Sequence, residues 1–187
     1  MVLCCRMQEI RALACVLAAA TLVLTVVATA TSTWRVTEET FFRESFGIFI
    51  SCRFQGYYRS CKLLDIASSE GWLHAVRFLM VFSIFTAFVA LVLGILGFIC
   101  ISHKINQPKV AGALMILTGL LIMIAAALYT GFTRDTLGPG GVVLYWGYSY
   151  IIAWVCMVLA LISGLLFFLV YDLPKDMWDP YEGSIYM

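Results

Sequence analysis

Two cysteines that could form a disulfide, Cys52 and Cys61, lie in a polar segment between two long apolar runs, with eight residues between them. A disulfide between them would require an oxidising compartment. Closing so short a loop would stabilise the fold by roughly 2.5–3 kcal/mol in the entropic model. Zinc is the alternative for paired thiols, but zinc takes four ligands, commonly with Cys-x2–4-Cys spacing, and His74 is the only further ligand nearby in the sequence. The segment favours a disulfide, and we predict no metal site.

Residues for catalysis are missing from the places where a membrane enzyme would need them. The long apolar runs contain no Asp or Glu, which excludes an intramembrane acid–base pair, a proton relay and an aspartyl dyad. The two histidines, His74 and His103, stand at opposite ends of one apolar run. The glycine-rich segment 138–141 is followed by no Lys-Ser or Lys-Thr, so it is not a phosphate-binding loop. We expect no enzyme activity and no cofactor.

The composition indicates that these residues belong to a membrane protein. Of 187 residues, 63% are hydrophobic and 12% are charged, whereas soluble domains average roughly 45–50% apolar and about 25% charged residues. A soluble chain of this length could not bury so much apolar surface and still cover itself with polar groups. The net charge of +1 provides no basic face for phosphates, so we expect no nucleic-acid partner. The lipid bilayer is the expected surrounding.

Four uncharged runs predict four transmembrane helices, at about 10–33, 73–102, 109–132 and 145–170. Each run is long enough, because a bilayer core needs about 20 apolar residues per helix. The chain is then a single membrane domain over 1–187, with loops 34–72 and 133–144 on one side and the tail 171–187 on the other.

The first run has an alternative interpretation as a signal peptide, because it ends in the small-residue pattern Ala28-Thr29-Ala30. The run is about 20 residues long, whereas the apolar region of a signal peptide is usually about 7–15 residues. We therefore expect the run to be retained as the first transmembrane helix.

The orientation of the chain in the membrane is predicted by the cysteines and not by the basic residues. Lysines and arginines are nearly balanced between the two sides of the membrane, so the positive-inside rule gives no direction. A disulfide between Cys52 and Cys61 would place the first loop outside the cell, in an oxidising space. We therefore predict a multi-pass protein of the plasma membrane with both termini in the cytoplasm.

Three further residues lie where the membrane edge is expected. Cys4 and Cys5 precede the first run, so they are candidates for S-palmitoylation, and the alternative is that they are simply small apolar residues. Arg77 is a charge a few residues inside the second predicted helix, and it could extend outward to water or pair with the first loop. A structural role for Arg77 is favoured over an ion pathway, since one buried charge makes a poor transporter.

The first loop resembles the claudin signature, W…G-L-W-x-x-C-x(8–10)-C. Its matching residues here are Trp34, Gly47, Ile48, Phe49, Cys52 and Cys61. Ile48 and Phe49 stand where the signature has leucine and tryptophan. The stretches CKLLDI and HAVRFLMV are similar to the end of a claudin first loop and the start of its second span. AALYTG and WGYSYIIAWV look more like peripheral myelin protein, the epithelial membrane proteins and the lens fibre membrane protein. The chain is thus identified as a member of the claudin superfamily.

The resemblance implies an all-α transmembrane four-helix bundle with a small extracellular antiparallel β-sheet, cross-linked by one disulfide. The sequence itself supports part of this fold. FGIFISCRF and YYRSCKLL are rich in β-branched and aromatic residues, and Gln55-Gly56 between them is a plausible turn. Small residues at helical spacing, such as Gly112 and Gly119, predict where helices pack closely.

The resemblance also implies a structural or adhesive role at cell–cell contacts or in membrane organisation, with other membrane proteins as partners in the same or the opposing membrane. The alternative is an auxiliary subunit of a larger membrane complex, such as an ion channel. An exposed apolar patch facing outward would favour adhesion, and a conspicuous lipid-facing helix stripe of small or polar residues would favour the subunit. The final residues Ile185-Tyr186-Met187 could add as an edge strand to a PDZ scaffold, and the alternative is a disordered tail.

Overall fold

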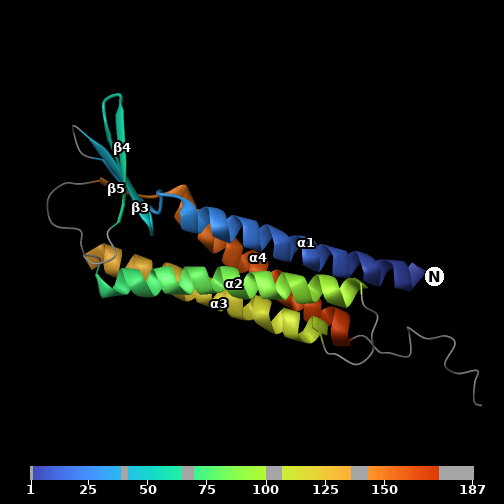
Figure 1. Ribbon diagram of the computed structural model, residues 1–187. Helices are drawn as coiled ribbons and strands as arrows, with labels where there is room; N and C mark the ends of the chain where they lie inside the picture. Colours follow the sequence, from blue (N-terminus) through green and yellow to red (C-terminus); the bar gives the residue numbers. More distant parts are fainter. Residues whose placement is uncertain (1, 39–41, 65–69, 100–106, 136–142, 173–187) are drawn as a thin grey trace, which may run out of the picture.

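The computed structural model of the chain describes residues 2–38, 42–64, 70–99, 107–135 and 143–172. Four long helices lie side by side in a bundle, and a small β-sheet stands at one end of it (Figure 1). The helices are α1 (Val2–Ala30), α2 (Gly71–Ile99), α3 (Gln107–Asp135) and α4 (Tyr148–Asp172). The start of α1 lies at the end of the bundle far from the sheet (Figure 1).

Each of the four helices is long and apolar enough to cross a membrane. The qualifying segments are Glu9–Ala30, Gly71–Gly97, Pro108–Thr133 and Tyr148–Leu169. α1 packs against α2 and α4, and α3 packs against the same two helices on the other side. With the sheet and the disulfide described below, this architecture confirms the predicted fold class.

The ends of all four helices differ from the ranges expected from the sequence, and the differences in α1 and α4 have a structural cause. α1 begins at Val2, well before residue 10, and it ends at Ala30 rather than 33, because the chain then turns to enter the sheet. α4 begins at Tyr148 rather than 145, because residues 143–146 form a strand. An apolar run cannot reveal such a change from strand to helix, since both elements are apolar when buried.

Small and hydroxyl-bearing residues allow the helices to approach one another. Gly112 on α3 faces Gly164 on α4, and a Cβ atom built on either glycine would lie 3.0 Å from the other's carbonyl oxygen. The hydroxyl of Ser163 donates to the carbonyl of Ala14 on α1 over 2.9 Å. Helices in lipid gain no hydrophobic energy by associating, so close backbone approach and hydrogen bonds between helices must hold them together.

The sheet has five antiparallel strands in the order β4-β3-β2-β1-β5. The strands are β1 (Arg35–Glu38), β2 (Arg43–Phe46), β3 (Ile50–Gln55), β4 (Tyr58–Leu63) and β5 (Val143–Trp146). β5 comes from the segment between α3 and α4 and pairs with β1. The sheet therefore joins the two connections that lie at this end of the bundle.

A tight turn connects β3 and β4 where the sequence predicted it. Gln55 pairs with Tyr58 across the ladder, which leaves Gly56 and Tyr57 as the two loop residues. Gly56 has φ 59°, the backbone conformation that a type II′ hairpin turn requires at its first central position. Glycine adopts this conformation without steric cost, and the turn fixes the register that places Cys52 opposite Cys61.

Candidate functional site

The sheet is attached to the bundle at a junction, which we define by Trp34, Gly47, Ile48, Arg77 and Gly147. The side chain of Trp34 is fully buried, and its indole Nε1 donates to the carbonyl of Ala28 over 2.7 Å. That carbonyl belongs to the last turn of α1, where carbonyls have no partner inside the helix. The Trp34 amide donates to Phe46 over 3.0 Å, and its carbonyl accepts from Gly147 over 3.0 Å. Trp34 thus connects α1 to both neighbouring strand ends.

Two glycines at the junction lie against backbone that leaves no room for a side chain. A Cβ atom on Gly47 would lie 2.6 Å from the carbonyl oxygen of Thr31, in the connection after α1. A Cβ atom on Gly147 would lie 1.8 Å from the carbonyl oxygen of Thr33. Both distances are well inside van der Waals contact, so the chain can pass only with glycine at these positions.

Arg77 links α2 to the sheet. Arg77 is only 6% exposed, and its Nε donates to the carbonyl of Ile48 over 2.9 Å. Its guanidinium carbon lies 5.5 Å from the ring centroid of Phe49, within cation–π range. The backbone carbonyl of Phe49 in turn accepts a hydrogen bond of 2.8 Å from the amide of Leu64, directly after β4. The motif residues that the sequence analysis named are thus brought together with the buried arginine.

A continuous series of aromatic rings surrounds the junction. Trp34 lies 5.0 Å from Tyr129 of α3 and 6.2 Å from Tyr150 of α4, measured between ring centroids. The series extends through four further rings to both sides, namely Trp72, Phe132, Trp146 and Trp154. Aromatic pairs at these separations add stability beyond the area that they bury. The rings make the junction a packed structural centre.

The predicted disulfide is present. It lies at one end of a row of paired residues that crosses the whole sheet. Cys52 of β3 is bonded to Cys61 of β4, and the two residues are paired in the ladder. The row continues in register through Ser45 and Val36 to Tyr145. The three central residues of the row are buried, whereas Tyr145 and Cys61 at its two ends are exposed.

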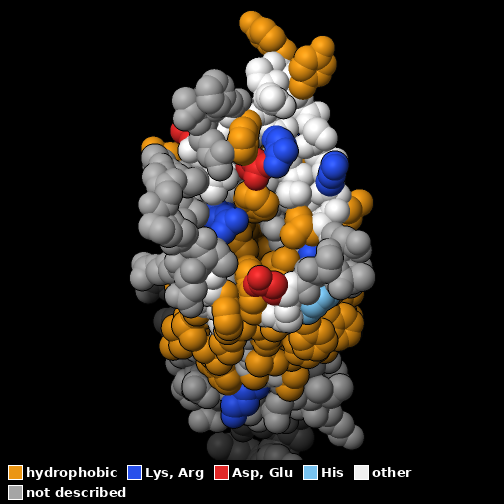
Figure 2. Space-filling view, turned by 90° about the vertical axis from the view of Figure 1, so that its left-hand side faces the viewer, with side chains coloured by type: hydrophobic (Ala, Val, Ile, Leu, Met, Phe, Trp, Pro, Cys, Tyr) orange, Lys and Arg blue, Asp and Glu red, His pale blue; other side chains and the backbone are white. Residues whose placement is uncertain are grey.

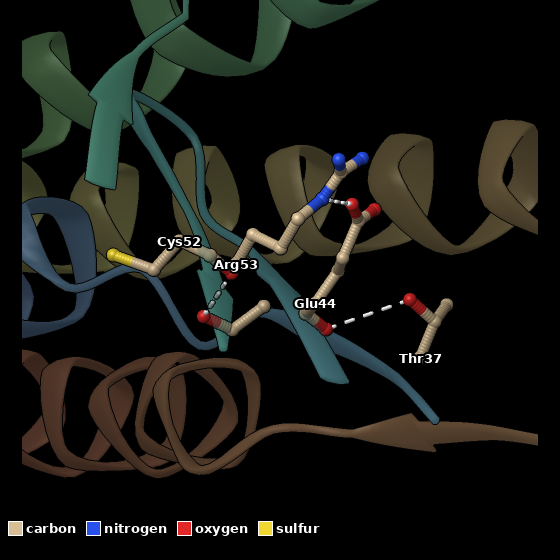
Figure 3. A network of polar contacts seen from close by, with 5 residues as sticks. Thr37, Glu44, Cys52 and Arg53 are labelled. Carbon is tan, nitrogen blue, oxygen red and sulfur yellow. Dashed lines mark hydrogen bonds and ion pairs between the residues drawn. The ribbon is translucent and has the colours of Figure 1, made fainter. Parts of the chain in front are cut away.

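The opposite face of the sheet carries a polar network. The guanidinium of Arg53 pairs with the carboxylate of Glu44 on the neighbouring strand. The hydroxyl of Thr37 donates to the backbone carbonyl of Glu44 over 3.5 Å. Figure 3 shows that the side chains of Cys52 and Arg53 point away from each other, as successive residues of a strand must. The disulfide and this network therefore lie on different faces.

The β3–β4 hairpin is the part of the sheet that projects farthest from the bundle. All six residues of β4 are exposed. Tyr57 is fully exposed and Tyr58 is 85% exposed. Viewed from the sheet end, hydrophobic side chains project at the top, above a face that carries lysine and arginine side chains (Figure 2). β3 and β4 contain Arg53, Arg59 and Lys62 but no acidic residue.

A second exposed feature is an apolar groove on the bundle, with a volume of about 700 Å³. It lies along α3, with one residue from α4. Its lining residues are Met123, Ile124, Ala127, Leu128, Gly131, Phe132 and Trp154. A Cβ atom on Gly131 would meet no atom within 4 Å, whereas Gly112, Gly119 and Gly164 all face a neighbouring helix. Packing within the described residues therefore does not account for Gly131.

Other predicted site residues have no described surroundings. Cys4 and Cys5 lie near the start of α1, and their acylation stays a prediction. The tail residues Ile185, Tyr186 and Met187 lie outside the described residues. Among the residues that the structure describes, no group of three or more His, Cys, Asp or Glu side chains could hold a metal ion.

The sequence analysis did not identify Gly147 of the junction or Tyr150, whose ring lies beside Trp34. A signal for Gly147 is nevertheless visible, because a glycine directly follows the short β-prone stretch 143–146. Such a glycine is typical of a place where another backbone comes close. Tyr150 is one of many aromatic residues in an apolar run, and its type and position alone do not distinguish it.

Comparisons with known proteins agree with this architecture. The model of the PMP-22/EMP/MP20/Claudin family matches residues 8–167. The lens fiber membrane intrinsic protein of Rattus norvegicus is 28% identical over 154 residues, which cover 80% of this chain and 84% of that protein. Claudin-15 of Bos taurus is 30% identical over 142 residues, which cover 68% of this chain and 58% of claudin-15. Claudin-19 of Homo sapiens is 32% identical over 131 residues, which cover 63% of this chain and 58% of claudin-19.

The family match covers most of the chain, including all four candidate spans apart from the last two residues of the fourth. It also covers the disulfide and every residue of the junction. The chain therefore belongs to the PMP-22/EMP/MP20/Claudin family.

Proposed function

We propose that this protein is a structural, non-enzymatic component of the plasma membrane that acts at cell–cell contacts through the β3–β4 hairpin. In this proposal the sheet faces the outside of the cell, and both termini lie in the cytoplasm. Family membership supports a membrane protein with four spans, and the name of the lens fiber membrane intrinsic protein describes that relative as a membrane protein. The disulfide supports an outward-facing sheet, because disulfides persist in oxidising compartments.

The observation on which the contact role rests is the exposure of Tyr57 and Tyr58 at the tip of the hairpin. Tyrosine is enriched at protein interfaces, because it offers a large contact area and loses little conformational entropy. The junction holds the base of the sheet rigidly on three helices, so the tip is presented at a fixed distance from the bundle. A rigid scaffold that displays exposed aromatic side chains is suited to binding another protein.

A cell-mixing experiment tests this proposal. The full chain is expressed with a fluorescent tag in cells that do not adhere, and its enrichment at contacts between two expressing cells is measured against contacts with a non-expressing cell. Replacing Tyr57 and Tyr58 by serine should abolish enrichment while surface expression is kept. Tyr145→Ser is the matched control, because Tyr145 is an exposed tyrosine at the opposite edge of the same sheet. Equal enrichment of all three proteins would reject the hairpin as the contact surface.

The second candidate function, an auxiliary subunit of a larger membrane complex, is favoured by the groove on α3. Ala127 and Gly131 are one turn apart on the exposed side of α3. Small residues with this spacing allow a second helix to approach closely in lipid. A glycine inside a helix costs about 1 kcal/mol relative to alanine, and a closely packed partner helix would offset this cost at Gly131.

Purification in mild detergent distinguishes the second candidate from the first. Gly131→Leu would fill the groove, so a partner helix bound there should no longer co-purify. Ala113→Leu is the matched control, since Ala113 is also small and exposed on α3 but does not line the groove. A partner that is retained by both variants would bind elsewhere on the protein.

A further inference from the structure

An arginine lies against both sulfur atoms of the disulfide. The Nε of Arg59 is 3.3 Å from Sγ of Cys61, and a terminal nitrogen of the same guanidinium is 3.9 Å from Sγ of Cys52. Arg59 is held in this position by Phe54, whose ring centroid lies 5.3 Å from the guanidinium carbon. Arg59 and Phe54 are paired in the β3–β4 ladder, on the same face as the two cysteines.

The two cysteine residues differ in their accessibility. Cys52 is 2% exposed and lies between β2 and β4, whereas Cys61 is exposed on the edge strand β4. A thiolate must approach the sulfur that it attacks along the direction of the S–S bond, so access decides which sulfur reacts. Cys61 is therefore the sulfur open to attack, and Cys52 is the leaving group.

We propose that the Cys52–Cys61 disulfide is a site of thiol exchange, at which low-molecular-weight thiols such as glutathione react with Cys61. The thiolate of the small molecule attacks Sγ of Cys61, the S–S bond breaks, and its electron pair passes to Sγ of Cys52. The product is a mixed disulfide on Cys61 and a thiolate on Cys52. The guanidinium of Arg59 stabilises that thiolate, and a leaving group with a lower pKa departs faster.

A second molecule of thiol completes the reduction. Its thiolate attacks the small-molecule sulfur of the mixed disulfide and releases Cys61 as a thiolate. The two small thiols leave joined as their disulfide, and their two protons pass through water to the protein cysteines. β4 is then attached to the sheet by its hydrogen bonds to β3 alone, since β4 is the edge strand. This inference does not depend on the proposed function.

The test measures how fast thiols open the disulfide in the purified full-length chain in detergent. Samples are treated with reduced glutathione or with the uncharged thiol 2-mercaptoethanol, quenched by alkylation, and mapped by mass spectrometry of peptides. We expect the adduct on Cys61, and we expect Arg59→Gln to slow opening about fivefold or more with both thiols. The uncharged thiol separates stabilisation of the leaving group from simple attraction of the anionic glutathione.

Two further variants make the result decisive. Lys62→Gln removes a positive charge next to Cys61 in the sequence but on the other face of β4, so its rate should stay within about twofold of the original. Arg59→Lys should restore most of the rate. A variant that only loosened the sheet would open faster, which is the opposite of the expected change. An unchanged or faster rate in Arg59→Gln with 2-mercaptoethanol, or an adduct on Cys52, would overturn the proposal.

Discussion

Arg77 on α2 donates a hydrogen bond of 2.9 Å to the backbone carbonyl of Ile48, which precedes it by 29 residues. Desolvation of a buried charge is costly unless its hydrogen bonds are satisfied. Here the partner is a carbonyl at the base of the sheet, and the ring of Phe49 adds a cation–π contact. Through these two contacts the arginine links α2 to the base of the sheet.

Replacing Arg77 by methionine, which is similar in length and uncharged, should lower the free energy of unfolding by about 1.5–3 kcal/mol, the usual contribution of a hydrogen bond from a charged group. Arg43→Met is the control, because Arg43 is exposed and its 3.3 Å pair with Glu38 contributes at most about 1 kcal/mol. Denaturant unfolding in detergent, followed by circular dichroism, measures both. Equal losses for the two variants would contradict the structural role of Arg77.

Gly147→Ala should prevent β5 from docking, because the new Cβ atom would lie 1.8 Å from the carbonyl oxygen of Thr33. We expect the free energy of unfolding to fall by at least about 3 kcal/mol, which is at the upper end of overpacking effects. Gly131→Ala, the same change on the open side of α3, should stabilise the helix by up to about 1 kcal/mol. Thermal midpoints in detergent distinguish the two changes. A Gly147→Ala protein as stable as the original would mean that β5 and β1 do not approach in this way.

Trp34→Phe keeps a ring at the centre of the junction but removes the donor to Ala28. The carbonyl of Ala28 then keeps only the longer contact of 3.4 Å from the Thr31 hydroxyl. Loss of the shorter bond should lower the free energy of unfolding by about 1 kcal/mol or more. Trp154→Phe is the comparison, because Trp154 is a partly exposed ring at the end of the aromatic series. Denaturant unfolding should show a clearly larger fall in the free energy of unfolding for Trp34→Phe than for Trp154→Phe. Similar losses would assign the role of Trp34 to its bulk and not to its indole nitrogen.

The hydrogen bond of 2.9 Å between Thr86 of α2 and Thr118 of α3 should contribute little to the free energy of unfolding. Each hydroxyl also has a carbonyl of its own helix within reach, from Ser83 and Leu114, so either threonine can be satisfied without the other. A double-mutant cycle with valine at both positions should give a coupling energy of about 0.6 kcal/mol, the average for such bonds in membranes. A coupling above about 2 kcal/mol would show that this bond is a main link between the helices.

The parts of the fold that could be predicted are those with strong local signals. Long uncharged runs indicate the spans, because lipid tolerates few charges. The Gln55-Gly56 turn and the pair Cys52 and Cys61 stand out because their residue types are specific. β1 and β2 gave no signal, since RVTE and RESF are short and contain charged residues. β5, with the sequence VLYW, is too apolar to be separated from the helix that follows it.

Only part of the membership of the junction could be predicted, because Gly147 was missed. The family resemblance singled out Trp34, Gly47, Ile48 and Phe49, and hydropathy singled out Arg77. Their contacts depend on partners far away in the sequence, such as the carbonyl of Ile48 for Arg77 and the backbone of Thr33 for Gly147. No periodicity within one element encodes such pairings.

The strand order has a consequence for biosynthesis. β1 receives its partner β2 within a few residues, but its other partner, β5, follows about 100 residues later, after α2 and α3 have been made. At roughly 5–20 residues per second, the ribosome leaves that edge of β1 unpaired for about 5–20 s. An open strand edge is a template for pairing with another chain. Nascent copies on neighbouring ribosomes can therefore exchange β5 during this interval, and slowed translation of α2 and α3 should increase the yield of such domain-swapped dimers.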